Sequence, residues 1–315
     1  MHPNKKRILI TGSAGLVGSA IKRQAAKFPE FEYIFLTRKD GDLTDLKVVE
    51  CLISSYTPDY VIHAAAKVGG IGGNMAGQAD YFIQNIRSNS NVIDCCHRYG
   101  VQKLLAFSSV CVFPDNLQIL QEDRMHDGPP FQGNFAYAHS KRMVDVHIQA
   151  LRDQHGVKNY CSIIPSNIIG THDLYNLKHG HVLPCLIHKI YMAKRDGIDL
   201  QVWGDGKSLR EFILSDDIAL ILLGLLARED EIPDRLTIAG EQQNSIREIV
   251  EFLVEAADFK GGVIYDTSKP NGQRARLSDL TRFHSLFPYF RQTPTRDAIA
   301  LSYKWFEENY PLVRL

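Results

Sequence analysis

Hydrophobic and polar positions in the first half of the chain follow two alternating patterns. Short runs of β-branched and aromatic residues are each followed by a longer stretch in which apolar residues recur every three or four positions. The first pattern predicts buried strands and the second predicts amphipathic helices. The expected strands are 7–11, 33–36, 60–63, 104–108 and 160–164, and the expected helices between them are 16–27, 46–55, 79–99 and 137–154.

This alternation predicts an α/β fold built on a Rossmann-type, doubly wound parallel sheet. After Pro165 the pattern changes, and loops rich in His, Asn and Gly precede further apolar stretches. We expect a dinucleotide-binding domain over residues 1–166 and a smaller C-terminal substrate-binding lid, mainly over 167–315, with 205–240 packing back onto the first domain. The later expected elements are a strand at 201–203 and helices at 182–194, 218–226, 245–257 and 295–309.

Charge and cysteine content narrow the class of protein. The 36 basic and 36 acidic residues cancel, which argues against nucleic acid or an anionic membrane as a partner. The six cysteines lack the CxxC spacing of a metal site and the density of a disulfide scaffold, so we expect no metal. The start of the chain has no apolar secretion segment, and the apolar run 218–227 is too short to span a bilayer. A cytoplasmic protein is expected.

The segment Thr11-Gly-Ser-Ala-Gly-Leu-Val-Gly18 lies between the first strand and the first helix. Gly12 permits a tight turn, Gly15 permits close approach of a pyrophosphate, and Gly18 permits close packing of helix on sheet. The free N–H groups and the positive dipole end of the helix favour phosphate. This context predicts a dinucleotide site.

The end of the second strand indicates which dinucleotide is bound. Arg38 stands where an acid would contact the ribose of NAD, so we expect NADP(H), although a solvated basic turn also fits the sequence. Asp42 is a plausible adenine contact or equally a helix cap. The small residues Ala64–Ala66 after the third strand suit either cofactor approach or simple close packing.

Two pairs of reactive side chains follow the glycine loop. Tyr137 and Lys141 are four residues apart, which places them on one face of a helix, and a nearby cation lowers the pKa of a phenol. Tyr-x-x-x-Lys also occurs on ordinary helix surfaces, so the pair is informative only beside the dinucleotide motif. Ser109 and Cys111 directly follow the expected fourth strand.

Together these motifs resemble the extended short-chain dehydrogenase/reductases over the whole chain. The finer motifs are similar to the branch that acts on GDP-4-keto-6-deoxy-D-mannose as a 3,5-epimerase and 4-reductase. That resemblance implies NADP(H), a GDP-sugar substrate, and a homodimer formed through the helix of Tyr137 and its neighbour at 79–99. The motifs are 64–70, 109–114, 165–170 with His172-Asp173, 180–184, 202–204 and 210–212.

The resemblance also implies roles for individual residues. A ketone at C4 acidifies the protons on C3 and C5, and Cys111 and His181 stand in the positions of base and acid. Cysteine and histidine suit these roles because their pKa values lie within reach of neutral pH. Ser109 and Tyr137 are expected to hydrogen-bond the C4 oxygen, and Lys141 to orient the nicotinamide ribose.

The remaining expected contacts are assigned to the cofactor or the substrate. Asn167 equally fits a turn cap, and Trp203 either packs on guanine or anchors the core of the lid. The expected cofactor contacts are Gly12, Ser13, Gly15, Leu16, Val17, Gly18, Arg38, Asp42, Leu43, Ala64, Ala65, Ala66, Tyr137, Lys141, Pro165 and Asn167. The expected substrate contacts are Asn167, His181, Lys189, Trp203, Arg210 and Arg276.

Other functions compete with this interpretation. A sugar-nucleotide 4-epimerase needs no Cys/His pair, and a 4,6-dehydratase is expected to carry acidic groups where Val110 and Cys111 stand. A non-catalytic NADPH-sensing protein tends to lose the tyrosine or the lysine, whereas both are present here. The sequence favours the epimerase/reductase, with another sugar-nucleotide enzyme of the same family as the alternative.

Overall fold

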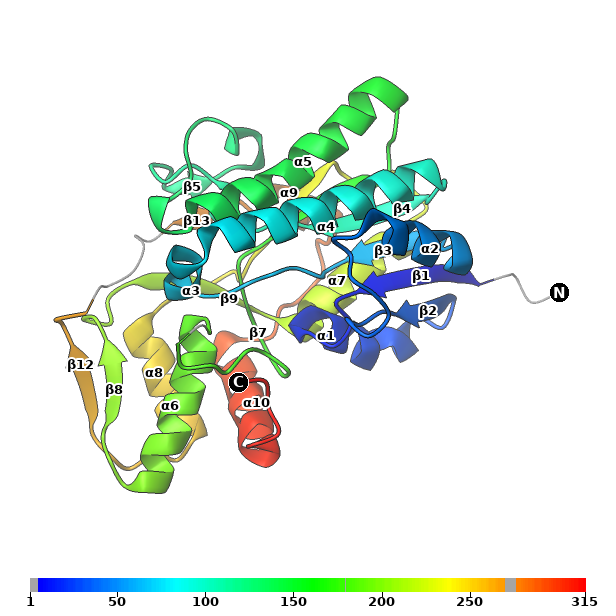
Figure 1. Ribbon diagram of the computed structural model, residues 1–315. Helices are drawn as coiled ribbons and strands as arrows, with labels where there is room; N and C mark the ends of the chain where they lie inside the picture. The colour runs from blue at the N-terminus through cyan, green and yellow to red at the C-terminus, as the bar shows by residue number, and fades with distance from the viewer. Residues whose placement is uncertain (1–4, 179, 270–275) are drawn as a thin grey trace.

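The computed structural model describes residues 5–178, 180–269 and 276–315. Its centre is a six-stranded parallel sheet in the order β10-β6-β4-β3-β1-β2 (Figure 1). The α/β class and the five strands expected in the first half of the chain are confirmed. The strands are β1 (Lys6–Thr11), β2 (Phe31–Phe35), β3 (Tyr60–His63), β4 (Lys103–Phe107), β6 (Tyr160–Pro165) and β10 (Arg235–Ile238).

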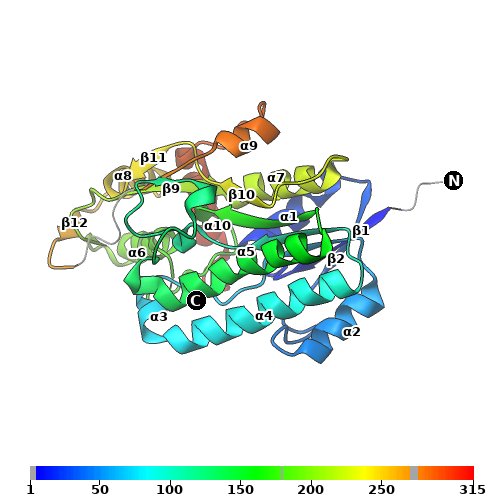
Figure 2. The ribbon, with the colours of Figure 1, turned by 90° about the horizontal axis from the view of Figure 1, so that it is seen from above.

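Helices cover both faces of this sheet, as the buried strands require (Figure 2). Side chains alternate along β1, so Ile8 and Ile10 pack in the same hydrophobic cluster as α1 and α7. Leu9 points to the opposite face and joins the cluster built from α2, α4 and α5. The helices are α1 (Leu16–Gln24), α2 (Leu46–Tyr56), α3 (Ile71–Ala76), α4 (Gln78–Arg98), α5 (Phe135–His155) and α7 (Ser215–Ala227).

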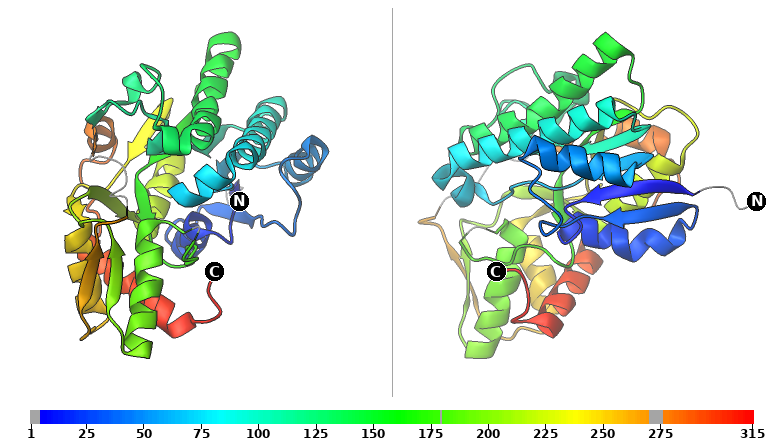
Figure 3. Two further views of the ribbon diagram at one scale, coloured as in Figure 1. Left: turned by 60° about the vertical axis from the view of Figure 1, so that its left-hand side comes forward. Right: turned by 45° about the vertical axis from the view of Figure 1, so that its right-hand side comes forward.

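The smaller half has its own hydrophobic core and lies at the carboxyl edge of the large sheet (Figure 3). It is built on a three-stranded sheet, β11-β9-β7, and a two-stranded sheet, β12-β8. Its strands are β7 (Asn167–Ile169), β8 (Leu200–Trp203), β9 (Leu209–Leu214), β11 (Gln243–Ser245) and β12 (Val263–Asp266), and its helices are α6 (Val182–Asp196), α8 (Ile246–Ala256) and α10 (Thr295–Asn309). The short α9 (Thr281–Leu286) and the pair β5 (Ile119–Leu120) and β13 (Leu277–Ser278) complete the fold.

The segment 205–240 divides between the two halves. β9 is paired with β7 and β11 in the smaller half. By contrast, α7 packs against α1, and β10 pairs with β6 as the edge strand of the large sheet. α7 and β10 therefore pack back onto the first domain, whereas β9 pairs within the smaller half and sends Ile213 into the core shared with α1 and α7.

The longest apolar run of the sequence forms most of α7. Its side chains are buried on nearly every side, between the large sheet and α1. A helix that is apolar all round belongs to a protein core when it is this short. Within the described ranges, no helix is both long enough and apolar enough to cross a bilayer.

Candidate active site

The glycine loop connects β1 to α1 at the point where the sheet order reverses. β2 lies on one side of β1 and β3 on the other, and ligands of such sheets bind in the crevice outside the carboxyl ends of the strands. Gly12 has φ 71°, and a Cβ there would lie 2.8 Å from the backbone nitrogen of Ala65. A Cβ on Gly18 would lie 2.4 Å from the Cα of Ser13. Both positions therefore require glycine.

A buried hydrogen-bond chain supports the floor of the loop. The backbone N–H of Ala65 donates to the Thr11 hydroxyl at 3.2 Å, and that hydroxyl is 2.8 Å from Nδ1 of His63. Nε2 of His63 is 3.1 Å from the amide oxygen of Asn89. Burial, with the nearby Lys141 cation, lowers the pKa of His63 to about 3, so its ring is neutral. Sequence analysis missed this role of His63.

The basic end of β2 is tied to the glycine loop. The N–H of Ser13 donates to the carbonyl of Leu36 at 3.0 Å, and the exposed Arg38 follows two residues later. The carboxylate of Asp42 accepts from the backbone and hydroxyl of Thr44, and these bonds, with Arg38 nearby, lower its pKa. The helix-cap alternative for Asp42 is wrong, because Asp45 is the N-cap of α2.

Three of the expected catalytic residues lie together beside this site. Ser109 is the N-cap of a 3₁₀ turn at Val110–Val112, and its hydroxyl accepts from the N–H of Cys111 at 3.3 Å. Tyr137 lies on the first turn of α5, where its phenol hydrogen-bonds Ser109 and feels the charge of Cys111. Residues from two segments of the chain thus form one cluster at the carboxyl end of β4.

The electrostatics of Tyr137 differ from the expectation. Burial, followed by the neighbouring Cys111, raises the pKa of the phenol, and the bond with Ser109 only partly opposes this. The ammonium of Lys141 donates from Nζ to the carbonyl of Phe107 at 2.8 Å. The expected lowering of the tyrosine pKa by Lys141 is therefore wrong for this structure. Tyr137 holds its proton at neutral pH.

Lys141 itself is almost fully buried, and burial lowers its pKa from 10.5 to about 7. The unfolded chain therefore binds one more proton than the folded chain between these pH values, so this group's contribution to stability rises with pH across that window. Below about pH 7 its destabilising effect is complete. We expect Lys141→Met to be more stable than the parent in urea unfolding at pH 6, with the difference shrinking by pH 9.5. A difference independent of pH would contradict this.

Arg142 fixes the turn that carries Cys111. Its guanidinium donates from Nε to the carbonyl of Val112 at 3.0 Å, again to Val112 from Nη2, and from Nη1 to Gly128 at 3.1 Å. Ser108 adds a bond from its hydroxyl to the carbonyl of Lys141 at 3.1 Å. Sequence analysis missed Arg142, although its position directly after Lys141 puts it on the next face of the same helix.

Other expected site residues belong to the smaller half. His181 is the N-cap of α6, and desolvation by the surrounding protein lowers the pKa of its imidazole. Among the described residues, no hydrogen bond joins His181 to Ser109, Cys111 or Tyr137. Trp203 is 60% exposed, so it does not anchor the core of the lid. Lys189 Nζ lies 5.0 Å from the centre of its ring.

Two arginines approach each other near the turn at Val110–Val112. Burial lowers the pKa of Arg210, and the charge of Arg276 lowers it further. Arg276 donates to the carbonyls of Val110, Phe113 and Pro114 at 3.5, 3.4 and 3.2 Å. Neighbouring guanidinium groups repel, and an anion bound between them relieves that repulsion. Asn167, expected beside the ligand, donates its amide to the carbonyl of Glu211 at 3.0 Å.

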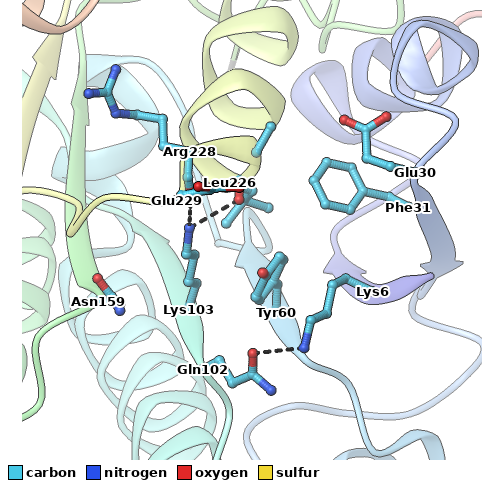
Figure 4. Close-up of a pocket in the computed structure, with 11 residues that line it drawn as sticks. Lys6, Glu30, Phe31, Tyr60, Gln102, Lys103, Asn159, Leu226, Arg228 and Glu229 are labelled. Carbon is cyan, nitrogen blue, oxygen red and sulfur yellow. Dashed lines mark hydrogen bonds between the residues drawn. The ribbon is translucent and has the colours of Figure 1, made fainter. Parts of the chain in front are cut away.

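A cavity of about 470 Å³ opens at the opposite, amino-terminal edge of the sheet (Figure 4). Within it the ammonium of Lys103 donates to the carbonyl of Leu226 at 3.1 Å and to that of Arg228. Lys103 thus caps the C-terminal end of α7. None of the expected site residues lines this cavity, so it is separate from the cluster of Ser109, Cys111 and Tyr137.

The fold and the site define a dinucleotide-binding α/β protein, and comparison with known proteins agrees. A model described as the NAD dependent epimerase/dehydratase family matches residues 8–239, and the chain belongs to this family. It is 38% identical to the GDP-L-fucose synthase of Dictyostelium discoideum, over 99% of this chain and 98% of that protein. It is 32% identical to the GDP-L-fucose synthase of Escherichia coli (strain K12), over 97% and 98%.

Solved structures give the same result. The chain resembles the crystal structure of a GDP-L-fucose synthetase from Naegleria fowleri with a TM-score of 0.91 and 36% identity, covering 98% of this chain and 95% of that one. That protein has also been solved bound to NADP, with the same TM-score. The resemblance inferred from the sequence motifs is confirmed.

Proposed function

We propose that this protein converts GDP-4-keto-6-deoxy-D-mannose into GDP-L-fucose, by inverting carbons C3 and C5 and then reducing the C4 ketone. The observation that carries the proposal is the cluster of Ser109, Cys111 and Tyr137 beside the glycine loop. The names of the similar proteins describe the same activity. The cofactor is NADP(H), in keeping with the NADP complex of the Naegleria protein.

The two inversions need a base and an acid on opposite sides of the sugar ring. We assign the base to Cys111, whose thiolate removes the proton from C3 or C5. The resulting negative charge moves to the C4 oxygen, where the hydroxyls of Ser109 and Tyr137 donate hydrogen bonds. We assign to His181, at the N-terminus of α6, the return of a proton to the opposite face of the same carbon.

The reduction needs a hydride and a proton, and bound NADPH supplies the hydride to C4. Tyr137 gives its phenolic proton to the C4 oxygen. Burial suits it to this role, because the raised pKa keeps the phenol protonated until the oxygen develops charge. Lys141, held at the carbonyl of Phe107, lies one turn along α5 and orients the nicotinamide ribose in this proposal.

The substrate diphosphate is assigned to Arg210 and Arg276. The two guanidinium groups repel each other and are partly buried, so a bound anion would stabilise them. Lys189 adds a third cation from α6. The exposed ring of Trp203 offers a stacking surface for guanine. Asn167 is assigned to the sugar or the diphosphate, within the edge of β7.

Arg38→Ala is expected to reduce the preference for NADPH over NADH by about tenfold or more, since a guanidinium–phosphate contact of this kind is lost only for NADPH. The measurement is kcat/KM with each cofactor at saturating sugar. Lys47→Ala, which changes an exposed cation on α2, serves as the matched control. An unaltered ratio would reject the 2′-phosphate role of Arg38.

The proposed activity is tested by mixing purified protein, NADPH and GDP-4-keto-6-deoxy-D-mannose, following the absorbance of the cofactor and identifying the product by NMR. Stoichiometric oxidation that yields GDP-L-fucose supports both halves of the proposal. Oxidation that yields an unepimerised GDP-6-deoxyhexose removes Cys111 and His181 from catalysis. NADPH binding without any oxidation favours a different keto-sugar nucleotide or the non-catalytic alternative.

A homodimer through α4 and α5 is part of the proposal. These two helices pack side by side and carry exposed apolar side chains, including Phe82 and Val146. Val146→Arg is expected to shift the protein to monomers in light scattering, because a charge would be buried between copies. Leu301→Arg, an exposed site on α10, is the control. A monomeric parent protein would refute the dimer.

We propose the cytoplasm as the location. All six cysteines are free thiols, and Cys95 and Cys96 are fully buried as adjacent residues of α4. Free thiols without disulfides are typical of proteins in a reducing compartment. Fractionation of the source cells tests this assignment.

A further inference from the structure

The last residues of the chain return to the glycine loop. After α10, Tyr310 and Val313 pack against the hydrophobic core of the smaller half. The backbone N–H of Tyr175 then donates to the carbonyl of Arg314 at 2.8 Å. The chain end, marked C in Figure 1, is thereby fixed near the start of α1.

The side chain of Arg314 extends from this position to the glycine loop. Its Nη1 atom is 3.9 Å from the point where a Cβ on Gly15 would lie, and the same atom donates to the carbonyl of His172 at 3.3 Å. Arg314 is exposed, and within the described part of the chain its guanidinium forms no ion pair. A guanidinium carries five N–H donors, so this single bond leaves donors for a further acceptor.

The segment that accepts this bond also borders the loop. A Cβ on Gly170 would lie 3.3 Å from a methyl group of Leu16, the first residue of α1. The ring of His172 is 4.5 Å from that of Trp305 on α10. The cation of Arg314 is thus held beside the first turn of α1 by contacts from two elements of the smaller half.

The N-terminus of α1 has no side chain that caps its free N–H groups. Gly15 is the N-cap residue and provides no side-chain cap, and the first turn contains no acidic residue. The N–H groups of this turn and the positive end of the helix dipole therefore favour a bound anion. Since a pyrophosphate approaches the chain at the second glycine of this motif, it would face the helix end and Arg314 together.

We propose that Arg314 binds the pyrophosphate of the dinucleotide, so that the smaller half of the chain completes the cofactor site. The inference rests on the dinucleotide site of the proposed function and adds a residue some three hundred positions from the glycine loop in sequence. Binding of the cofactor then joins the two halves of the molecule through its phosphates. The pyrophosphate is common to NADPH and NADH, which separates this contact from that of Arg38.

The test is calorimetric binding of NADPH and of NADH, each without sugar. Arg314→Ala is expected to raise the Kd for both cofactors about tenfold, the effect of one lost charge-assisted contact. Arg314→Lys keeps the charge and is expected to recover part of the affinity. Arg296→Ala, an exposed arginine on α10 paired with Glu255, is the matched control and is expected to bind as the parent does.

The outcomes separate the possibilities. Unchanged Kd values for Arg314→Ala would overturn the proposal, and weaker binding of NADPH alone would overturn the pyrophosphate assignment in favour of the 2′-phosphate. An unchanged melting temperature without cofactor shows that the variant is folded. If the parent converts the sugar while Arg314→Ala binds both cofactors normally, this inference fails and the proposed function stands.

Discussion

Replacing Tyr137 with phenylalanine is expected to lower the rate of ketone reduction by about 10²- to 10⁴-fold, the usual contribution of a positioned proton donor. The hydroxyl is the only group removed, and it hydrogen-bonds Ser109 at the carboxyl end of β4. Because the ring remains, its edge-to-face contact with Tyr81, at 6.4 Å between centres, is retained. The rate is measured from NADPH oxidation at saturating sugar.

Cofactor affinity distinguishes a chemical effect from a structural one. The Kd for NADPH of Tyr137→Phe is expected to stay within about threefold of the parent value, less than one hydrogen bond is worth. Tyr56→Phe, on the exposed surface of α2, removes the same hydroxyl group away from the site and should leave turnover unchanged. Unchanged turnover in Tyr137→Phe would exclude the tyrosine as the proton donor.

Cys111→Ser is expected to slow exchange of the C3 and C5 protons with solvent deuterium by about 10²-fold or more, since a hydroxyl is a far poorer base than a thiolate. Reduction of the ketone should fall less, because Tyr137 and the glycine loop remain in place. NMR of the sugar in D₂O measures exchange, with NADP⁺ present to fill the cofactor site. The rate of NADPH oxidation gives the reduction step separately.

The two rates must diverge for the assignment to hold. If exchange and reduction fall together, the substitution has disturbed the turn that Arg142 and Arg276 hold, and the base role is not supported. Cys185→Ser changes another half-buried thiol, on α6, and provides the matched control. Retention of rapid exchange in Cys111→Ser would exclude Cys111 as the base.

Sequence patterns predicted much of the fold because the spacing of apolar residues within one segment indicates whether it forms a strand or a helix. The strand β3 was predicted with its observed ends, since four consecutive buried residues separate a polar turn from the small residues at 64–66. β7, β9, β10 and β11 were not predicted. Their residues are short runs whose extended form depends on distant partners, such as the pairing of Arg235–Ile238 with Ser162–Pro165.

Local sequence patterns were enough to predict the glycine loop, the parallel sheet and the four candidate residues Ser109, Cys111, Tyr137 and Lys141. Each prediction follows from the spacing of residues or from the end of a strand, and such patterns can be read within one short segment of the chain. The burial and the hydrogen-bond partners of those residues depend on the tertiary structure. Burial raises the pKa of Tyr137, against the sequence expectation, and the folded chain places the carbonyl of Phe107 within hydrogen-bond reach of the Lys141 ammonium. The folded chain also places Arg314 beside Gly15, because contacts between residues far apart in sequence exist only once the whole chain has folded.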